Sequence, residues 1–119
     1  MYNETRGLVN ITVSSTKTMS EITQRTMKII ASLFGDKEEI LVKLELESKC
    51  STNVPGCSDW SNSQLERIWF AVLKLSDGEL SKLRSSIELA NTDFRDLLMT
   101  AGFGHDLEAH NKWFKQQNC

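Results

Sequence analysis

Residues 36–47, DKEEILVKLELE, decide the fold class of this chain, because the same twelve letters suit both a helix and a strand. A helix is favoured by the high content of Glu, Leu and Lys, and by Asp36 with Glu39, which have the spacing of a capping box. The helix would nevertheless leave apolar side chains on two opposite sides, because Val42 and Leu46 fall away from the others. Those others are Ile40, Leu41 and Leu44.

The strand interpretation of the same segment gives a more regular pattern. Apolar and charged residues alternate from residue 40 onward, so one face would be apolar and the other charged, with only Leu41 out of place. We therefore predict a strand over residues 40–47. Its apolar face would consist of Ile40, Val42, Leu44 and Leu46, and its charged face of Lys43, Glu45 and Glu47.

The residues before this segment predict one strand and one helix. In residues 8–15 β-branched residues alternate with polar ones, which is typical of a half-buried strand. A helix should follow, because Thr18 and Glu21 have the spacing of a capping box and Gly35 supplies a stop. The N-terminal half is therefore expected to be β-α-β.

The residues after a loop at 48–60 predict four helices, because apolar residues recur there every three to four positions. The first of these helices is the most apolar and should form the centre of the core. Its capping box is either Ser61 with Gln64 or Ser63 with Glu66.

The last two helices have the clearest end signals in the chain. Thr92 is placed to cap the first of them, and Gly102 supplies the left-handed residue that ends it, with Phe103 folding back in a Schellman closure. Asp106 can then cap the last helix. These signals indicate a fold but point to no catalytic activity.

Together these elements predict an α+β fold, a β-α-β half followed by about four helices, with an all-α bundle as the alternative if residues 36–48 are helical. A chain of 119 residues is expected to form a single domain, 1–119, with residues 1–6 disordered. Two strands make only a marginal sheet, and a second copy of the chain would complete it at the strand edge. The sequence therefore predicts a homodimer.

The composition limits the classes of partner. The formal net charge is −2 and positive and negative residues are interspersed, which argues against a nucleic acid. No apolar run reaches the ~18 residues needed to cross a bilayer, so no membrane association is expected. Residues 1–20 lack the basic start, apolar core and cleavage site of a secretory signal, which predicts a cytoplasmic protein.

Residues 65–114 contain a particular set of apolar, glycine and charged residues. The set consists of Leu73-Lys74-Leu75-Ser76, Gly78, Leu80, Leu83, Asp93, Arg95-Asp96-Leu97-Leu98, Ala101-Gly102-Phe103, His110 and Trp113. Through these residues the sequence resembles an uncharacterised family of small bacterial proteins. The resemblance spans less than half of the chain. The resemblance implies a shared helical packing unit with no known activity or cofactor, of the kind that mobile gene cassettes of bacteria often encode.

Residues 104–110, GHDLEAH, are the strongest candidate for a catalytic or metal site. Asp106 and His110 are four residues apart, so a helix would place them on one face, where they could bind one metal ion. No third ligand is apparent, Asp106 suits an N-cap, and His110 falls on an apolar stripe. We therefore predict a buried, hydrogen-bonded His110 and no metal or cofactor; the alternative is an enzyme that uses His110 with Asp96 or Asp106.

The cysteines do not form a zinc-binding pattern. Cys50 and Cys57 flank a loop whose Pro55-Gly56 pair suits the centre of a type II turn. The two-residue gap of a zinc knuckle is missing, and no second pair of Cys or His follows at a useful spacing. Reduced thiols are expected, although an oxidant could join Cys50 to Cys57.

Arg95 and Asp96, next to Asp93, form a charged group with two interpretations. The group could bind the carboxylate or phosphate of a ligand. Such a group more often fixes the start of a helix to its neighbour, and we favour this structural role.

The last two helices also have the layout of a helix-turn-helix. The second of them would begin with Asp106 and Glu108, whose carboxylates would repel the phosphates of DNA. DNA binding is therefore the least favoured function.

Several aromatic side chains are candidates for exposure. Trp60 stands at the edge of the loop, Phe70 lies off the main stripe of its helix, and Trp113 lies on the last helix. Together with Arg95 they form the predicted surface for a ligand or partner. The expected function is a non-catalytic interaction or small-ligand-binding module that acts as a homodimer, its partner a protein or a small apolar ligand.

Overall fold

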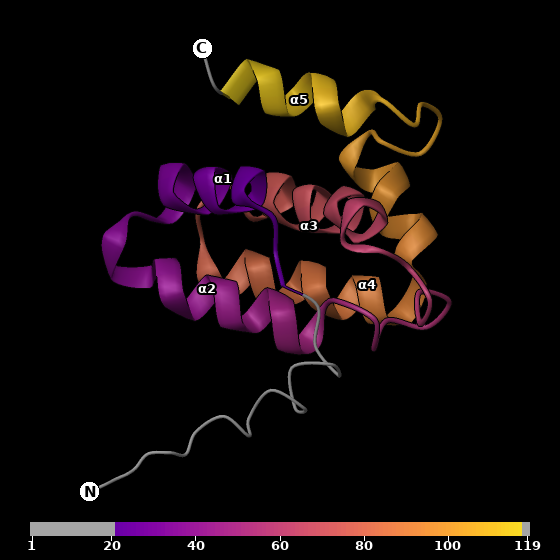
Figure 1. The fold of residues 1–119 in the computed structure, drawn as a ribbon, viewed down its shortest axis with the longest axis horizontal. Coiled ribbons are helices and arrows are strands. Elements are labelled where there is room, and N and C mark those ends of the chain that lie inside the picture. Colours follow the sequence, from indigo (N-terminus) through magenta and orange to yellow (C-terminus); the bar gives the residue numbers. More distant parts are fainter. Residues whose placement is uncertain (1–20, 118–119) are drawn as a thin grey trace, which may run out of the picture.

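The computed structural model describes residues 21–117, which form five α-helices and no strand (Figure 1). Within these residues no helix is long and apolar enough to cross a membrane. The predicted strand at 8–15, the Thr18 cap and residues 1–6 lie outside the described part of the chain. The helices are α1, Gln24–Phe34; α2, Asp36–Lys49; α3, Asn62–Ser76; α4, Leu80–Ala101; and α5, Ala109–Gln117.

The predicted α+β fold is wrong, and the all-α alternative is correct for residues 21–117. The segment predicted as a strand, residues 40–47, is the central part of α2. Val42 and Leu46, four residues apart, are both fully buried and anchor one side of the helix to the core. The acidic residues of its first turn and Lys49 in its last turn also suit the helix dipole.

Gly35 both ends α1 and begins α2. Thr23 caps α1, because its hydroxyl oxygen accepts the Thr26 amide at 3.2 Å, and α1 ends at Gly35 as predicted. Gly35 has a φ of 77°, which favours glycine. Asp36 is already the first helical residue, so the expected capping box with Glu39 does not form. The two helices lie side by side with one residue between them (Figure 1).

The sequence correctly predicted α3 as the centre of the core. At its start the Ser61 hydroxyl accepts the Gln64 amide at 3.3 Å, and the Gln64 side chain accepts the Ser61 amide at 2.8 Å. Every residue from 68 to 73 is buried. The Trp69 indole donates to the Cys50 carbonyl at 2.6 Å, which ties the end of α2 to α3.

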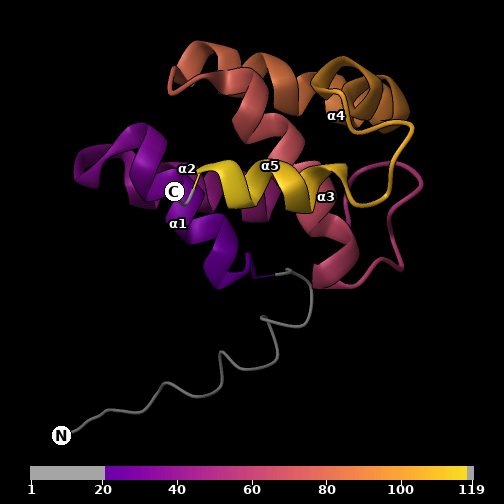
Figure 2. The same ribbon diagram turned by 90° about the horizontal axis from the view of Figure 1, so that it is seen from above.

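The helices form three tiers in Figure 1. One outer tier is α5, the middle tier contains α1 and α3, and the other outer tier contains α2 and the first part of α4. Seen from above, α5 crosses over α1 and α3 (Figure 2). The outer position of α2 leaves one of its sides without a neighbour among the other four described helices.

α4 changes course at Asp93, whose φ of −162° and ψ of 97° are not helical. The Asp93 carboxylate accepts the backbone amides of Arg95 at 3.0 Å and Asp96 at 3.4 Å. These are the bonds of an N-cap, so a helical segment starts here, one residue later than the predicted Thr92 cap. Asp93 thus caps its own helical segment, whereas no hydrogen bond or ion pair among the described residues joins the Arg95 or Asp96 side chain to a neighbouring helix, so the predicted link to that helix is not seen.

The predicted end of α4 is confirmed. Gly102 has a φ of 84°, its amide donates to the Met99 carbonyl at 3.0 Å, and the Phe103 amide donates to the Leu98 carbonyl at 2.8 Å. Phe103 then turns back into the core, where it is 1% exposed. This is a Schellman closure, and it directs the following loop toward α5.

Candidate functional site

The side of α2 that faces solvent is apolar. Ile40, Leu41 and Leu44 are 62%, 40% and 50% exposed. Val42 and Leu46, which anchor the helix, point the other way. Within the described residues only two other large apolar side chains are strongly exposed, and neither lies on α2. We call Ile40, Leu41 and Leu44 the α2 apolar face.

Charge is distributed unevenly along α2. Its first turn is acidic and its last turn is basic. Between them Glu47 is buried and paired, because it accepts Lys43 at 3.0 Å and the Ile22 amide at 3.1 Å. The first turn of α2 is therefore acidic apart from Lys37, whereas Lys49 in its last turn lies on the side toward α4 and pairs with Glu45. The acidic residues are Asp36, Glu38 and Glu39, and the basic residue is Lys49.

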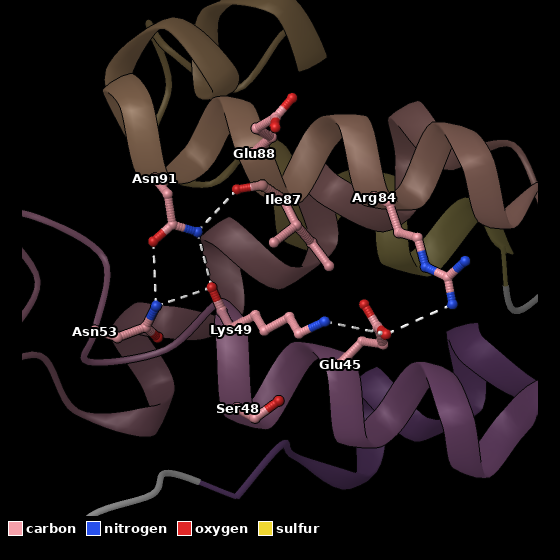
Figure 3. Close-up of a pocket in the computed structure, with 8 residues that line it drawn as sticks. All are labelled: Glu45, Ser48, Lys49, Asn53, Arg84, Ile87, Glu88 and Asn91. Atoms are coloured by element: carbon pink, nitrogen blue, oxygen red, sulfur yellow. Dashed lines mark hydrogen bonds and ion pairs between the residues drawn. The ribbon is translucent and has the colours of Figure 1, made fainter.

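A groove of about 490 Å³ runs between α2 and α4 (Figure 3). The side-chain amide of Asn91 donates to the Lys49 carbonyl at 2.8 Å and to the Ile87 carbonyl at 2.9 Å. The Asn53 amide donates to the same Lys49 carbonyl at 3.0 Å and to the Asn91 side chain at 3.1 Å. These hydrogen bonds occupy the Lys49 carbonyl at the end of α2 and join α2 to α4. The groove is lined by Glu45, Ser48, Lys49, Asn53, Arg84, Ile87, Glu88 and Asn91.

Three of the four charged residues in this groove pair with each other, and the fourth, Glu88, is exposed. The Glu45 carboxylate lies 3.5 Å from the Lys49 ammonium and 3.6 Å from the Arg84 guanidinium (Figure 3). Both cations are more than half exposed, so each pair contributes little to stability. The groove contains no buried charge that lacks a partner, and we interpret it as part of the contact between α2 and α4.

His110 lies in an aromatic cluster and is 8% exposed. Its ring centroid is 5.7 Å from that of Phe70 and 6.3 Å from that of Phe103. Its pKa is lowered, mainly because burial disfavours the charged ring, while the Glu66 carboxylate opposes this. The predicted burial is confirmed, but the Nδ1 atom is buried without a hydrogen-bond partner.

Neither predicted acidic partner of His110 is joined to it by a hydrogen bond. Asp106 accepts the Glu108 amide at 2.8 Å and the Lys112 ammonium at 3.0 Å, and these bonds lower its pKa. Asp96 is exposed on α4. Among residues 21–117 no group of three or more potential metal ligands is found. The contacts of His110 are therefore those of a core residue.

The polar contacts next to His110 are made by Arg25 and Glu66. Their side chains form an ion pair at 2.9 Å, and the guanidinium also donates to the Asn111 side chain. The same guanidinium lies 5.3 Å from the Phe70 ring centroid and 4.6 Å from that of Phe114. This cluster joins α1, α3 and α5.

The predicted aromatic surface is mostly inside the protein. Phe70 is fully buried, and Trp60 and Trp113 are partly buried. Trp60 packs edge-to-face on Phe94, with centroids 5.1 Å apart. Trp113 lies 5.8 Å from Phe70 between ring centroids. These side chains therefore pack the helices and the loop before α3 together.

Cys50 and Cys57 are fully buried free thiols. Burial raises the pKa of Cys50 to about 12 and that of Cys57 to about 11, so both are protonated at neutral pH. The predicted turn between them is present: Gly56 has a φ of 90°, and the Cys57 amide donates to the Val54 carbonyl at 2.9 Å.

No protein-family model, curated protein or solved structure matches this chain. The resemblance over residues 65–114 remains a prediction.

The α2 apolar face was not predicted as a site. Its signal in the sequence is the two-sided apolar pattern of residues 36–47, which favours a strand over a helix with one buried face. The helix forms with this pattern intact, and the unburied side becomes the surface.

Proposed function

We propose that this protein is a non-catalytic interaction module that acts as a homodimer, in which the α2 apolar faces of two copies pack together. The observation that carries the proposal is the exposure of Ile40, Leu41 and Leu44 on one side of a single helix. The strand edge that first suggested a dimer has no counterpart within residues 21–117, so the proposal rests on α2 alone.

The apolar face supplies the attraction between the two copies. Each of its side chains is 40–62% exposed, and covering one would contribute about 1 kcal/mol. α2 contains 14 residues, which corresponds to a length of about 21 Å. Two such helices bury less than the roughly 800 Å² per partner of a standard interface. We therefore expect a reversible dimer with a dissociation constant of roughly 10 µM to 1 mM.

The charges at the ends of α2 favour a second copy as the occupant. If two α2 helices pack antiparallel, the acidic first turn of each lies beside the basic end of the other. Lys49 of the second copy is then at the same end of the contact as Asp36; because it is 62% exposed but pairs with Glu45 in the groove with α4, its attraction acts at long range, and the helix dipoles oppose each other favourably. A parallel arrangement would place like charges together. This self-complementarity supports an isologous dimer with twofold symmetry.

Sedimentation equilibrium of the full chain from about 5 to 500 µM tests the proposal. The average mass should rise from 13.5 kDa toward twice that value as the concentration increases. Leu44→Glu should weaken the dimer at least tenfold, because it places a carboxylate in the apolar contact.

Leu107→Glu is the matched control, because Leu107 is 71% exposed and lies outside α2. It makes the same chemical change and should leave the dissociation constant unchanged. A constant mass of one chain over the whole range, or equal weakening by both substitutions, would contradict the proposal.

A further inference from the structure

A second pocket, of about 340 Å³, lies at the C-terminal end of α4. Its size is at the lower end of the roughly 300–1,000 Å³ typical of small-molecule sites. It combines two arginines with an apolar floor, and no acidic residue lines it. The lining residues are Arg67, Phe94, Arg95, Leu98, Met99 and Gly104.

The two guanidinium groups of this pocket have unused donors. The Arg67 Nη2 atom donates to the Phe103 carbonyl at 2.6 Å, but its Nε atom is buried without a partner. The Arg95 side chain makes no hydrogen bond or ion pair with any residue of the described chain. An unpaired buried donor carries a desolvation cost, and the positive charge of the same guanidinium favours an anion in the pocket.

The nearby carboxylates are already engaged elsewhere. Asp93 accepts the backbone amides that begin the helical segment, one of them from Arg95 itself. Asp106 is bound by Lys112 at 3.0 Å. Asp96 follows Arg95 directly on α4, and neighbouring helical residues do not face each other. No carboxylate lines the pocket, although the charge of Arg67 also helps to lower the pKa of Asp106 outside it.

The rest of the pocket is apolar. Phe94 is held in place by its edge-to-face contact with Trp60, and Leu98 is 4% exposed. Met99 is 50% exposed and lies against Gly104, where an added Cβ atom would stand 2.2 Å from the Met99 sulfur. A side chain at position 104 would therefore have to displace the Met99 side chain. The floor thus offers aromatic, aliphatic and thioether contacts.

We propose that this pocket binds a small organic carboxylate with an aromatic or aliphatic body. The guanidinium groups of Arg67 and Arg95 would bind the carboxylate, since their planar donors match its two oxygens. The body would lie on Phe94, Leu98 and Met99. No residue of α2 lines the pocket, so this site is independent of the proposed dimer contact.

The test uses the full chain labelled with ¹⁵N, titrated with phenylacetate and, separately, with its neutral counterpart phenylacetamide. Phenylacetate should shift the amide signals of Arg95, Leu98, Met99 and Gly104 saturably, with a dissociation constant below about 1 mM. Phenylacetamide should bind at least tenfold more weakly, because it lacks the charge that the arginines recognise. Inorganic phosphate, which has the charge without the body, should also bind at least tenfold more weakly.

Arg95→Gln should weaken phenylacetate binding at least fivefold without unfolding the protein, because Arg95 is exposed. Arg84→Gln makes the same change elsewhere on α4 and should have no effect. The proposal is overturned if no saturable shift occurs up to about 10 mM, or if acid and amide bind equally. Equal binding of phosphate, or equal effects of the two variants, would overturn it as well.

Discussion

Leu44 and Leu46 stand two residues apart on α2 and point to opposite sides of it: Leu46 is fully buried and Leu44 is 50% exposed. In a strand, side chains two residues apart share a face. In this helix, one leucine holds α2 on the core while the other belongs to the α2 apolar face. The same local pattern therefore supplies both an anchor and a contact surface.

Alanine substitutions at these two positions should have very different effects on stability. Leu46→Ala should lower the free energy of unfolding by about 2–4 kcal/mol, because it removes buried methyl groups and leaves a cavity. Leu44→Ala should change the free energy of unfolding by less than about 0.5 kcal/mol, because the Leu44 side chain is exposed to solvent in the monomer. Urea denaturation followed by circular dichroism, at a concentration where the protein is monomeric, measures both. Equal losses would indicate that both leucines share one buried face, as in a strand.

Reversing the charge at the start of α2 should weaken the dimer. In Asp36→Lys combined with Glu39→Lys, lysines replace carboxylates beside the basic end of the second copy, and we expect several-fold weaker association at low salt. Sedimentation equilibrium measures the effect, and added salt should reduce it.

Asp77→Lys combined with Glu79→Lys is the control for this charge reversal. It makes the same change in net charge just before α4, outside α2. The dimer should keep its affinity in this variant. Antiparallel packing of α2 is excluded if both double variants weaken association to the same extent.

The ion pair between Arg25 and Glu66 should be important for stability. Glu66→Ala removes a buried carboxylate that binds both Arg25 and the Thr23 hydroxyl, so the free energy of unfolding should fall by about 1–3 kcal/mol. Glu79→Ala, which removes an exposed pair with Lys82, should cost less than about 0.5 kcal/mol. Chemical denaturation compares the two variants, and similar losses would show that the cluster joining α1, α3 and α5 is not a significant contact.

His110 should make the protein less stable in mild acid. Burial lowers its pKa below the ordinary value of 6.5, so the unfolded chain binds a proton that the folded one resists. The contribution of neutral His110 to the free energy of unfolding is therefore fully present above about pH 6.5. It is lost as the pH falls from this value to the folded pKa of His110.

Urea denaturation at a series of pH values between about 5 and 8 measures this slope. His110→Phe should flatten it, because the titrating ring is removed from the aromatic cluster. His105→Gln should retain it, because His105 is exposed. A slope that persists in His110→Phe would assign the pH dependence to other groups.

Features set by neighbouring residues were predictable from the sequence. The capping box of Ser61 with Gln64, the stop at Gly35 and the closure at Gly102 and Phe103 all appear as expected. Each depends on hydrogen bonds within a few residues or on the φ values that glycine tolerates. The apolar period of α3 was also sufficient to place that helix at the centre of the core.

Contacts between distant residues were not predictable in this way. Arg25 and Glu66 are 41 positions apart, and nothing in their own neighbourhoods pairs them. Arg67 and Arg95 lie on different helices and line the same pocket only because α3 packs on α4. His110 was expected in the core, but the ring contacts that surround it come from α3 and the loop after α4.

The sequence by itself determined the start of α3 and the ends of α1 and α4, because those signals are local. For residues 36–47 it allowed both a helix and a strand, since each structure could bury part of the apolar residues. The tertiary structure decided between them: the core accepts Val42 and Leu46 from one side of a helix, and no second strand is present among the described residues. Packing also decided that Ile40, Leu41 and Leu44 are exposed, because no other helix of residues 21–117 covers that side of α2.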